Sequence, residues 1–389
     1  MSQGAGDVDT PVGLTQALLR IRSENPIGNE QEIASFIADW FRRLDVEVSV
    51  YDVAPGRPNV VARLRGGGAP PLAYVAHMDT VPAGEGWSFD AFGGAVADGR
   101  IYGRGAADMK SGLAASMLAL RRAAEASTGR ARDFLVCATV DEEGARMLGA
   151  VDLVERGLVR RDALVVATEP TGLDLVVAHK GVMWYRLETR GKMSHAGTPH
   201  IGADANHGLC EALVALKRRF AALPYEHPQL GRASVTIGQM AGGAKTNVVP
   251  ATAWAEVDTR LVPPMATTEA EAIIREVAEQ VPHWVPGVTA SASVVTIDRP
   301  PVQARLDSPL IAAFAEAFRQ VAGREVGRTG FPAYTDAAII SAMTGNQHCV
   351  LFGPGHLEQA HTVDEFVPVE EVETATAVLS RTAAILLAS

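Results

Sequence analysis

Histidine and carboxylate side chains lie along the chain in an order that suits a site for two metal ions. They occur in the segments AYVAHMDTVP, YGRGAADMKSG, TVDEEG, VATEPT and EQAHTVDEF, as His77, Asp108, Glu142, Glu143, Glu169 and His361. Two imidazoles with several carboxylates suit zinc, cobalt or manganese better than magnesium or calcium. The set holds one carboxylate more than two closed metal sites need, and a spare carboxylate can act as the base for a metal-activated water. The residues therefore indicate a hydrolase with two divalent ions.

His77 ends an apolar segment and is followed by Asp79 in a His-x-Asp arrangement. Residues two apart in a strand face the same side, so we expect Asp79 to approach the His77 ring. A carboxylate that fixes the orientation of a metal-binding histidine is common in metal sites. By itself, a His-x-Asp pair is more often a polar strand end without a ligand role. The other acids along the chain are what favour His77 as a metal ligand.

The acids follow expected strands. Asp108 comes after a glycine-rich turn and before a helix expected to begin near Ser111, where it could cap the helix or offer one oxygen to each of two metals. Glu142 and Glu143 follow FLVCATV, and Glu169 follows ALVVAT. If the loop leaves its strand irregularly, one of the adjacent glutamates can coordinate metal while the other faces the substrate water. Ligands of open α/β sheets bind at the carboxyl ends of strands, where these acids are expected.

The segment GPGHLEQAHTVDEF contains two histidines, His356 and His361, and their spacing does not decide which one binds metal. Gly353 and Gly355 mark a tight loop that could bring backbone N–H groups near a ligand.

A second group of polar residues lies between residues 181 and 297. His195 in KMSHAGTPH reads by itself as a surface loop histidine, and Asn247 lies in the loop AGGAKTNVVP. Arg260 ends a strand and could bind a carboxylate with its two-pronged fork, or be a solvated cation.

The order of the expected elements predicts an α/β fold. In the first half, helices at 14–21, 30–44, 112–124 and 149–156 alternate with strands at 46–53, 59–64, 72–77, 133–140 and 163–168. This alternation predicts a mixed, mostly parallel sheet covered by helices on both faces. From residue 182, strands and helices follow a β-α-β-β-α-β order over 182–189, 203–223, 233–240, 251–261, 268–280 and 288–297. We therefore predict a catalytic domain in two parts, 1–180 and 298–389, and an inserted domain over 181–297.

Bulk properties narrow the class of protein. A chain of 389 residues points to two domains or to one domain with an insertion. A net charge of −10 argues against nucleic acid as a partner, and the apolar stretches are far shorter than a membrane span. The N-terminal residues lack a signal-peptide pattern, and the three cysteines form neither a disulfide framework nor a metal knuckle. We expect a cytoplasmic location.

Taken together, the motifs resemble the family that contains acetylornithine deacetylase, succinyl-diaminopimelate desuccinylase, aminoacylase and glutamate carboxypeptidase. The matching segments run in family order from about Asn25 to Val367: HMDTVP, YGRGAADMKSG, TVDEEG, EPT, SHAGTPHIGADA, GGAKTNVVP, VDTR, YTDA and AHTVDEFV. The resemblance implies a catalytic domain with two zinc ions and a smaller lid domain that forms a homodimer.

The resemblance also implies which residues bind the metals. Asp108 would bridge the two ions, His77 and Glu169 would complete one site, and Glu143 and His361 would complete the other. His361 is preferred over His356 on this ground alone.

For catalysis, the resemblance implies that Glu142 is the general base and later the acid, and that Asp79 orients His77. His195 would reach the neighbouring subunit's active site and stabilise the oxyanion. Asn247 and Arg260 would hold the carboxylate of the substrate.

Small departures from the family pattern bear on the substrate. FPAYTDAA carries Tyr334 where relatives often have a smaller, glycine-containing sequence, and this segment resembles one that lines the substrate pocket. The glutamate of EPT matches the deacetylase and carboxypeptidase branches better than the dipeptidase branches. We predict hydrolysis of an amide in an N-acyl amino acid or related carboxylate-bearing small molecule. The alternatives are a carboxypeptidase or dipeptidase, a hydrolase of a non-peptide amine or carbamoyl compound, and a metal-binding scaffold without activity.

Overall fold

The computed structural model describes residues 7–26, 29–126, 129–144, 146–296 and 298–389. Within these ranges, no helix has both the length and the apolar character that crossing a membrane requires. The chain divides into two compact units. Unit 1 comprises Met1–Val177, Gln303–Thr329 and Thr335–Ser389, and unit 2 comprises Ala178–Val302 and Gly330–Tyr334.

A mixed sheet forms the centre of unit 1. Its strands follow the order β1-β2-β6-β3-β7-β19-β8-β17, with β18 paired to β8. The neighbours β6, β3, β7 and β19 run parallel, whereas β1 is antiparallel to β2, β2 to β6, and β8 to β19. The strands span β1 Glu47–Ala54, β2 Arg57–Leu64, β3 Ala69–His77, β6 Arg132–Thr139, β7 Leu164–Ala167, β8 Leu175–His179, β17 Val302–Gln303, β18 Arg328–Phe331 and β19 Cys349–Leu351. A separate small sheet joins β4 (Ala95–Ala97), β5 (Arg100–Tyr102) and β20 (Phe366–Pro368).

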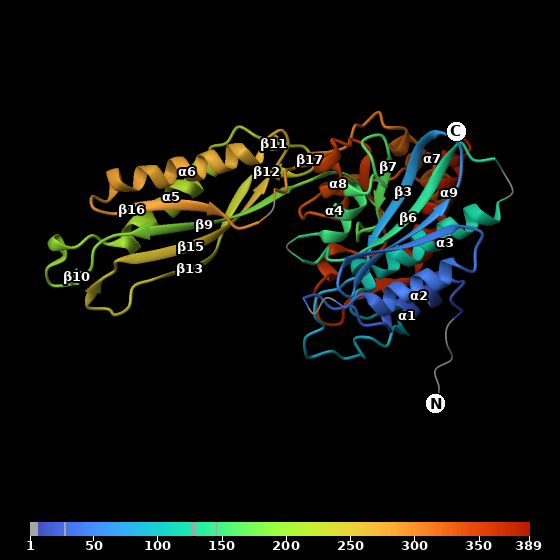
Figure 1. Cartoon of the computed structure of the whole chain (residues 1–389), viewed down its shortest axis with the longest axis horizontal. Coiled ribbons are helices and arrows are strands. Elements are labelled where there is room, and N and C mark those ends of the chain that lie inside the picture. Colours follow the sequence, from blue (N-terminus) through green and yellow to red (C-terminus); the bar gives the residue numbers. More distant parts are fainter. Residues whose placement is uncertain (1–6, 27–28, 127–128, 145, 297) are drawn as a thin grey trace. The chain divides into compact units, whose positions relative to one another are not determined.

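Helices cover both faces of the central sheet (Figure 1). They are α1 Pro11–Leu19, α2 Gln31–Phe41, α3 Ser111–Glu125, α4 Leu148–Glu155, α7 Pro309–Ala322, α8 Asp336–Thr344 and α9 Val369–Leu387. Helices α1, α2, α3, α7 and α9 contribute to one apolar core with alternate residues of the strands, among them Leu72, Tyr74 and Ala76 of β3. Helices α4 and α8 pack on each other, and α8 also contacts β3, β7 and β19. Burial on both faces explains why β3 and β6 are almost continuously apolar.

Unit 2 has the predicted β-α-β-β-α-β order. Its sheet follows the order β13-β15-β9-β16, and α5 and α6 lie together on one face (Figure 1). The elements are β9 Gly181–Arg190, α5 Ala205–Ala221, β13 Ser234–Gly242, β15 Thr252–Leu261, α6 Thr267–Trp284 and β16 Thr289–Val294, with short strands β10 Ser194–His195, β11 Glu226–His227, β12 Gly231–Arg232 and β14 Val248–Val249. Along β15, buried residues alternate with half-exposed ones, so one face of the sheet is left open.

The predicted fold class is confirmed, and most expected elements lie within a few residues of the observed ones. The sequence did not predict β8, α8 or α9. The strand β8 (LVVAH) is buried throughout, and the first half of α8 is buried as well. Short apolar runs of this kind show neither a strand nor a helix period. Unit 2 also takes in Gly330–Tyr334, a segment that the sequence assigned to the second part of the catalytic domain.

Candidate active site

His77 lies at the carboxyl end of β3 and is 1% exposed. Its Nδ1 is 2.8 Å from the carbonyl oxygen of Asp79, and its Nε2 is 3.0 Å from Oδ1 of Asp108. Because a carbonyl oxygen can only accept, Nδ1 carries the ring proton and Nε2 is left as the nitrogen that can bind metal. Asp79 contacts the His77 ring through its backbone carbonyl oxygen, and its carboxylate stays 3.7 Å from Nδ1.

The Asp79 carboxylate instead holds the loop that carries the adjacent glutamates. It accepts hydrogen bonds from the backbone N–H groups of Glu142 at 3.2 Å and Glu143 at 3.1 Å, and from Nδ2 of Asn25 at 2.9 Å. One buried aspartate thereby fixes the end of β3 relative to the loop after β6.

That loop leaves its strand irregularly, as we expected from the two adjacent glutamates. Asp141 adopts a left-handed backbone with φ 63°, an uncommon conformation for a residue other than glycine. Its carboxylate is held by Arg57 Nη1 at 2.7 Å and Asn25 Nδ2 at 3.2 Å. The turn at Asp141 allows Glu142 and Glu143 to face different neighbours.

Asp108 lies in the turn between β5 and α3, which begins with Gly105 at φ 89°. The helix-capping alternative does not hold, because the Asp108 carboxylate contacts histidines and Lys110 is the residue at the N-terminal cap of α3. The buried Glu365 carboxylate accepts from the N–H groups of Gly105, Ala107 and Asp108 at 2.9–3.2 Å and pairs with Arg104 at 2.6 Å. Glu365 therefore sets the position of the Asp108 turn.

His361, and not His356, lies beside the other predicted ligands. His361 Nε2 is 2.9 Å from Oε1 of Glu143 and 3.5 Å from Oδ2 of Asp108. His356 Nε2 lies 3.0 Å from Glu371, at a different place in unit 1. The two oxygens of Asp108 thus face two different histidines, His77 and His361, which is the arrangement that a bridging carboxylate requires.

Glu169 follows β7 and is 3% exposed. Its Oε1 has no hydrogen-bond donor among the described residues. Gly353 packs against the same strand end: a Cβ at this position would come within 2.5 Å of the carbonyl oxygens of Thr168 and Glu169. Its N–H donates to the Thr171 hydroxyl at 3.1 Å, so the structure gives Gly353 a packing contact, and substrate binding by this residue stays a prediction.

The carboxylates crowd one another. Burial raises the pKa of Glu142 and of Glu169 well above the usual range, and the neighbouring carboxylates add to this effect, against the lowering effect of His77. Burial would lower the pKa of His77, but the Asp108, Glu142 and Glu169 carboxylates raise it well above its usual value. Buried negative charges of this density are stabilised by cations.

The residues fit a metal centre. His77, Asp108 and Glu143 each offer a ligand atom, and these atoms lie within 4.8 Å of one another. The donor-free oxygen of Glu169 and the contact of His361 with both Asp108 and Glu143 extend this group to the predicted set. Imidazole and carboxylate ligands of this number suit first-row divalent ions.

Two buried acids beside the site were missed by sequence reasoning. Asp336 begins α8, accepts from the Thr139 hydroxyl and has its pKa raised to about 7 by burial, with Asp79 and Asp141 adding to the rise. Glu365 holds the Asp108 turn, as described above. Both acids lie in segments that carry the family resemblance, YTDA and AHTVDEFV, and that was the available signal.

In unit 2, His195 and Asn247 lie on neighbouring segments. His195 pairs with Val248 across β10 and β14, and the Ala196 N–H donates to the Asn247 carbonyl oxygen at 3.1 Å. The Gly197 N–H donates to Nδ1 of His195 at 3.0 Å. In the neutral ring the proton therefore sits on Nε2, which is free to donate to a ligand.

Arg260 and Tyr334 also belong to unit 2. Arg260 is the last but one residue of β15, and its guanidinium pairs with Asp258. Tyr334 is 9% exposed, and its hydroxyl has no hydrogen-bond partner within the part of the chain that the structure describes. Burial raises the pKa of this phenol.

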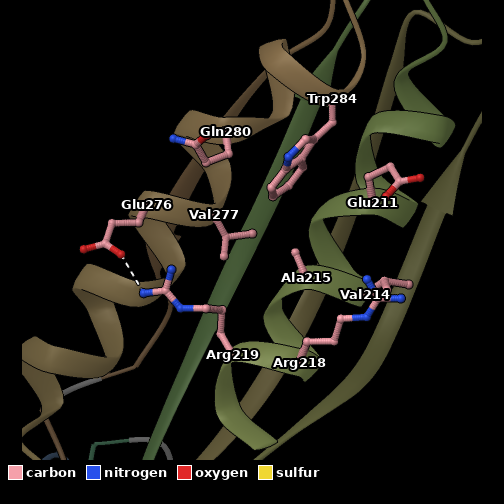
Figure 2. Close-up of a pocket in the computed structure, with 9 residues that line it drawn as sticks. All are labelled: Glu211, Val214, Ala215, Arg218, Arg219, Glu276, Val277, Gln280 and Trp284. Atoms are coloured by element: carbon pink, nitrogen blue, oxygen red, sulfur yellow. Dashed lines mark hydrogen bonds and ion pairs between the residues drawn. The ribbon is translucent and has the colours of Figure 1, made fainter. Parts of the chain in front are cut away.

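A hollow of about 320 Å³ lies between α5 and α6 on the helical face of unit 2, with an ion pair between Arg219 and Glu276 across it (Figure 2). Val214, Val277 and Trp284 give it an apolar wall. It contains none of the predicted site residues, so its position does not favour it as the active site.

Comparison with known proteins identifies the class. Residues 73–384 match the model of peptidase family M20/M25/M40, which covers most of the chain. The chain belongs to this family and is a metallohydrolase, with the mixed α/β fold of its members.

The individual relatives include both acylases and peptidases. The chain is 28% identical to a probable succinyl-diaminopimelate desuccinylase of Staphylococcus epidermidis, over 92% of each chain. It is 30% identical to an acetylornithine deacetylase of Vibrio campbellii, over 91% of each chain. Its fold is similar to that of a dinuclear metal-binding peptidase of the M20 family from Bacillus subtilis, with a TM-score of 0.74 at 18% identity over 98% of this chain and 99% of that one.

Proposed function

We propose that this protein hydrolyses the amide bond of an N-acyl amino acid or a related small molecule that bears a carboxylate. The observation that carries the proposal is a group of candidate metal ligands at the carboxyl end of the central sheet: His77, Asp108, Glu143, Glu169 and His361. Glu142 lies beside this group and is not needed as a ligand. The similarity to a desuccinylase and a deacetylase supports an acyl amino acid as the substrate class.

Two divalent ions, zinc in the first place and cobalt or manganese as alternatives, would lower the pKa of a bound water and polarise the scissile carbonyl. His77, Asp108, Glu143, Glu169 and His361 would hold them, with Asp108 shared. Glu142 takes a proton from the attacking water and gives it to the amide nitrogen as the C–N bond breaks, so that the leaving group departs as a neutral amine. Burial and neighbouring carboxylates raise the pKa of Glu142, which suits a group that must both accept and donate near neutral pH.

Residues of unit 2 complete the proposed chemistry. The Nε2–H of His195 donates to the oxyanion that forms at the carbonyl carbon. Arg260 and Asn247 bind the substrate's carboxylate, and Tyr334 borders the substrate.

A substrate panel tests the proposed activity. N-acetyl and N-succinyl amino acids, dipeptides and N-carbamoyl amino acids are incubated with enzyme loaded with zinc, cobalt or manganese, and product release is measured. We expect N-acyl amino acids to have the highest kcat/KM. Faster cleavage of dipeptides would replace the deacylase assignment with a peptidase, and turnover of none of the panel would contradict the proposed function.

We propose further that the protein is a homodimer through unit 2 and that each subunit lends His195 to its partner. Strand β13 is an edge strand, paired on one side with β15, and it exposes Ile237 and Met240. An exposed, apolar edge strand is a template for pairing with a second chain.

Mixing two inactive variants tests the shared site. Glu142→Ala and His195→Ala subunits are each expected to be inactive as homodimers, whereas a mixed dimer combines an intact Glu142 and an intact His195 in one of its two sites. After subunit exchange of equal amounts, about a quarter of the unmixed wild-type activity is expected, because half of the dimers are mixed and each has one intact site.

Exchange is followed by native mass spectrometry with differently tagged subunits. A mixture that contains mixed dimers but gains no activity would contradict the lending of His195 between subunits. The Glu142→Ala homodimer mixed with itself is the control for the exchange treatment.

A further inference from the structure

Arg260 is held on two sides by its own unit. Its Nε donates to Asp258 Oδ1 at 2.7 Å, its Nη2 donates to Asp258 Oδ2 at 3.1 Å, and its Nη1 donates to the Pro332 carbonyl oxygen at 3.2 Å. A guanidinium has five N–H groups. Among the described residues, one N–H therefore remains on each of Nη1 and Nη2, the two nitrogens that together form a fork for a carboxylate.

Trp184 holds the carboxylate of Asp258, and this carboxylate in turn holds Arg260. Residues 184 and 258 are opposite each other in the pairing of β9 with β15. From this position the Trp184 indole Nε1 donates to Asp258 Oδ2 at 2.7 Å. The Asp258 carboxylate thus accepts from one indole and from two nitrogens of Arg260, so neither side chain can turn without breaking several bonds.

The charge around Arg260 favours an anion. The pKa of Lys180 is lowered by burial and by the nearby Arg260 guanidinium, so two cationic side chains lie close to each other here, and the Asp258 carboxylate pairs with one of them. The side chains of Arg260 and Asp258 are 34% and 24% exposed, so a ligand can reach them. An ion pair this exposed contributes little to stability. Its geometry is better explained by orientation of the arginine.

A second arginine on the same sheet face provides a contrast. Arg186 lies between two acids: its Nε donates to Glu188 at 3.0 Å and its Nη1 to Glu256 at 2.9 Å. Its guanidinium also lies 4.0 Å from the centre of the Trp254 ring. The Arg186 group thus contains the same residue types as the Arg260 group, but two carboxylates offset the charge of Arg186. Of these two arginines, Arg260 pairs with one carboxylate and Arg186 with two.

We propose that Trp184 and Asp258 are positioning residues that hold the Nη1–Nη2 fork of Arg260 ready for the carboxylate of the substrate. The inference rests on the proposed function and deepens it, because a fixed planar fork selects a free carboxylate over a carboxamide or an ester at the same position. It assigns selectivity to two residues that do not themselves touch the substrate.

The test compares a substrate with its neutral analogue. Acetate release from N-acetyl-L-methionine and from N-acetyl-L-methioninamide is measured with zinc-loaded enzyme, and the ratio of the two kcat/KM values gives the selectivity for the carboxylate. The variants are Arg260→Ala, Asp258→Asn and Trp184→Phe. Glu256→Gln and Trp254→Phe are matched controls from the Arg186 group.

We expect a graded loss of selectivity. Arg260→Ala should lower the ratio about 100-fold, Asp258→Asn about tenfold and Trp184→Phe about threefold, in line with the loss of successively fewer charge-assisted hydrogen bonds. The loss should appear in KM for the carboxylate substrate. For Asp258→Asn and Trp184→Phe, kcat/KM for the amide should stay nearly unchanged. Thermal unfolding shows whether each variant, including Arg260→Ala, is folded. The controls should keep the full ratio.

The outcomes separate the inference from the proposed function. If the wild-type enzyme prefers the carboxylate and Arg260→Ala loses that preference, but Asp258→Asn and Trp184→Phe keep it, the positioning role is wrong and the proposed function stands. An equal loss of selectivity in the Glu256→Gln and Trp254→Phe controls would likewise overturn it. A wild-type enzyme that cleaves neither compound, or both equally, contradicts carboxylate recognition by the proposed function and overturns the inference with it.

Discussion

Replacing Glu142 by alanine is expected to lower kcat by about 10²–10⁴-fold, the usual contribution of a general base, while the metal content stays near that of the unchanged enzyme. The reason is that the adjacent residues Glu142 and Glu143 have different contacts. Glu143 contacts His361 and lies in the group of candidate ligands, whereas Glu142 shares the loop held by Asp79 without being needed as a ligand. The measurement is kcat on the best substrate of the panel, with metal determined by elemental analysis of the dialysed protein.

The adjacent residue supplies the matched control. Glu143→Ala removes a carboxylate of the same kind from the same loop, and it is expected to lose metal together with activity. If Glu142→Ala keeps substantial activity, or if it loses metal as Glu143→Ala does, the assignment of the base is wrong.

Replacing Asp108 by alanine is expected to remove metal from both sites. Its two oxygens lie 3.0 Å from His77 Nε2 and 3.5 Å from His361 Nε2, so a single carboxylate serves both halves of the centre. Loss of a residue that only supports a ligand costs about 10–100-fold in metal affinity, and loss of the shared ligand should cost roughly 100-fold or more. Zinc affinity is measured by competition with a chromophoric chelator, and zinc content by elemental analysis.

Thermal unfolding gives an independent measure of the same loss. Ligands that bind only the folded state raise its stability, so zinc should raise the Tm of the unchanged enzyme and have little effect on Asp108→Ala. In the presence of a chelator, the variant should be less stable than the unchanged enzyme, because the hydrogen bond and ion pairs of Asp108 with His77 and His361 are lost. Against burial, which would raise it, these contacts lower the pKa of Asp108. The exposed Asp39 of α2 offers a control, since Asp39→Asn removes a surface acid that lies in none of the segments with candidate ligands and should leave zinc binding unchanged. Retention of two zinc equivalents by Asp108→Ala would rule out a bridging role.

Local sequence signals were enough for the types and order of the site residues. Histidine and carboxylates at the ends of apolar, β-branched segments predicted a site at the carboxyl edge of a parallel sheet, and His77 and Glu169 lie at the ends of the neighbouring strands β3 and β7. The alternation in unit 2 predicted its β-α-β-β-α-β order. These features follow from periodicities of two and 3.6 residues, which are properties of short stretches of chain.

Contacts between distant segments were decided only by the tertiary structure. Spacing left His356 and His361 equivalent, and it is packing that brings His361 to Glu143, 218 residues earlier in the chain, while His356 pairs with Glu371. The Asp79 carboxylate was expected at the His77 ring and instead holds the backbone of the glutamate loop. Likewise, the hydrogen bond from the Asp108 N–H to the Glu365 carboxylate joins residues that are 257 positions apart.

The sequence alone therefore predicted a set of candidate ligands and a base for a two-metal hydrolase, together with an α/β insertion that carries an arginine suited to a carboxylate. The tertiary structure decided which side of Arg260 is occupied, which histidine joins the acids, and which buried carboxylates orient the others. The physical reason is that hydrogen bonds between side chains depend on distances of a few tenths of an ångström. Such distances are set by the packing of elements far apart in the chain, and no local pattern of residues encodes them.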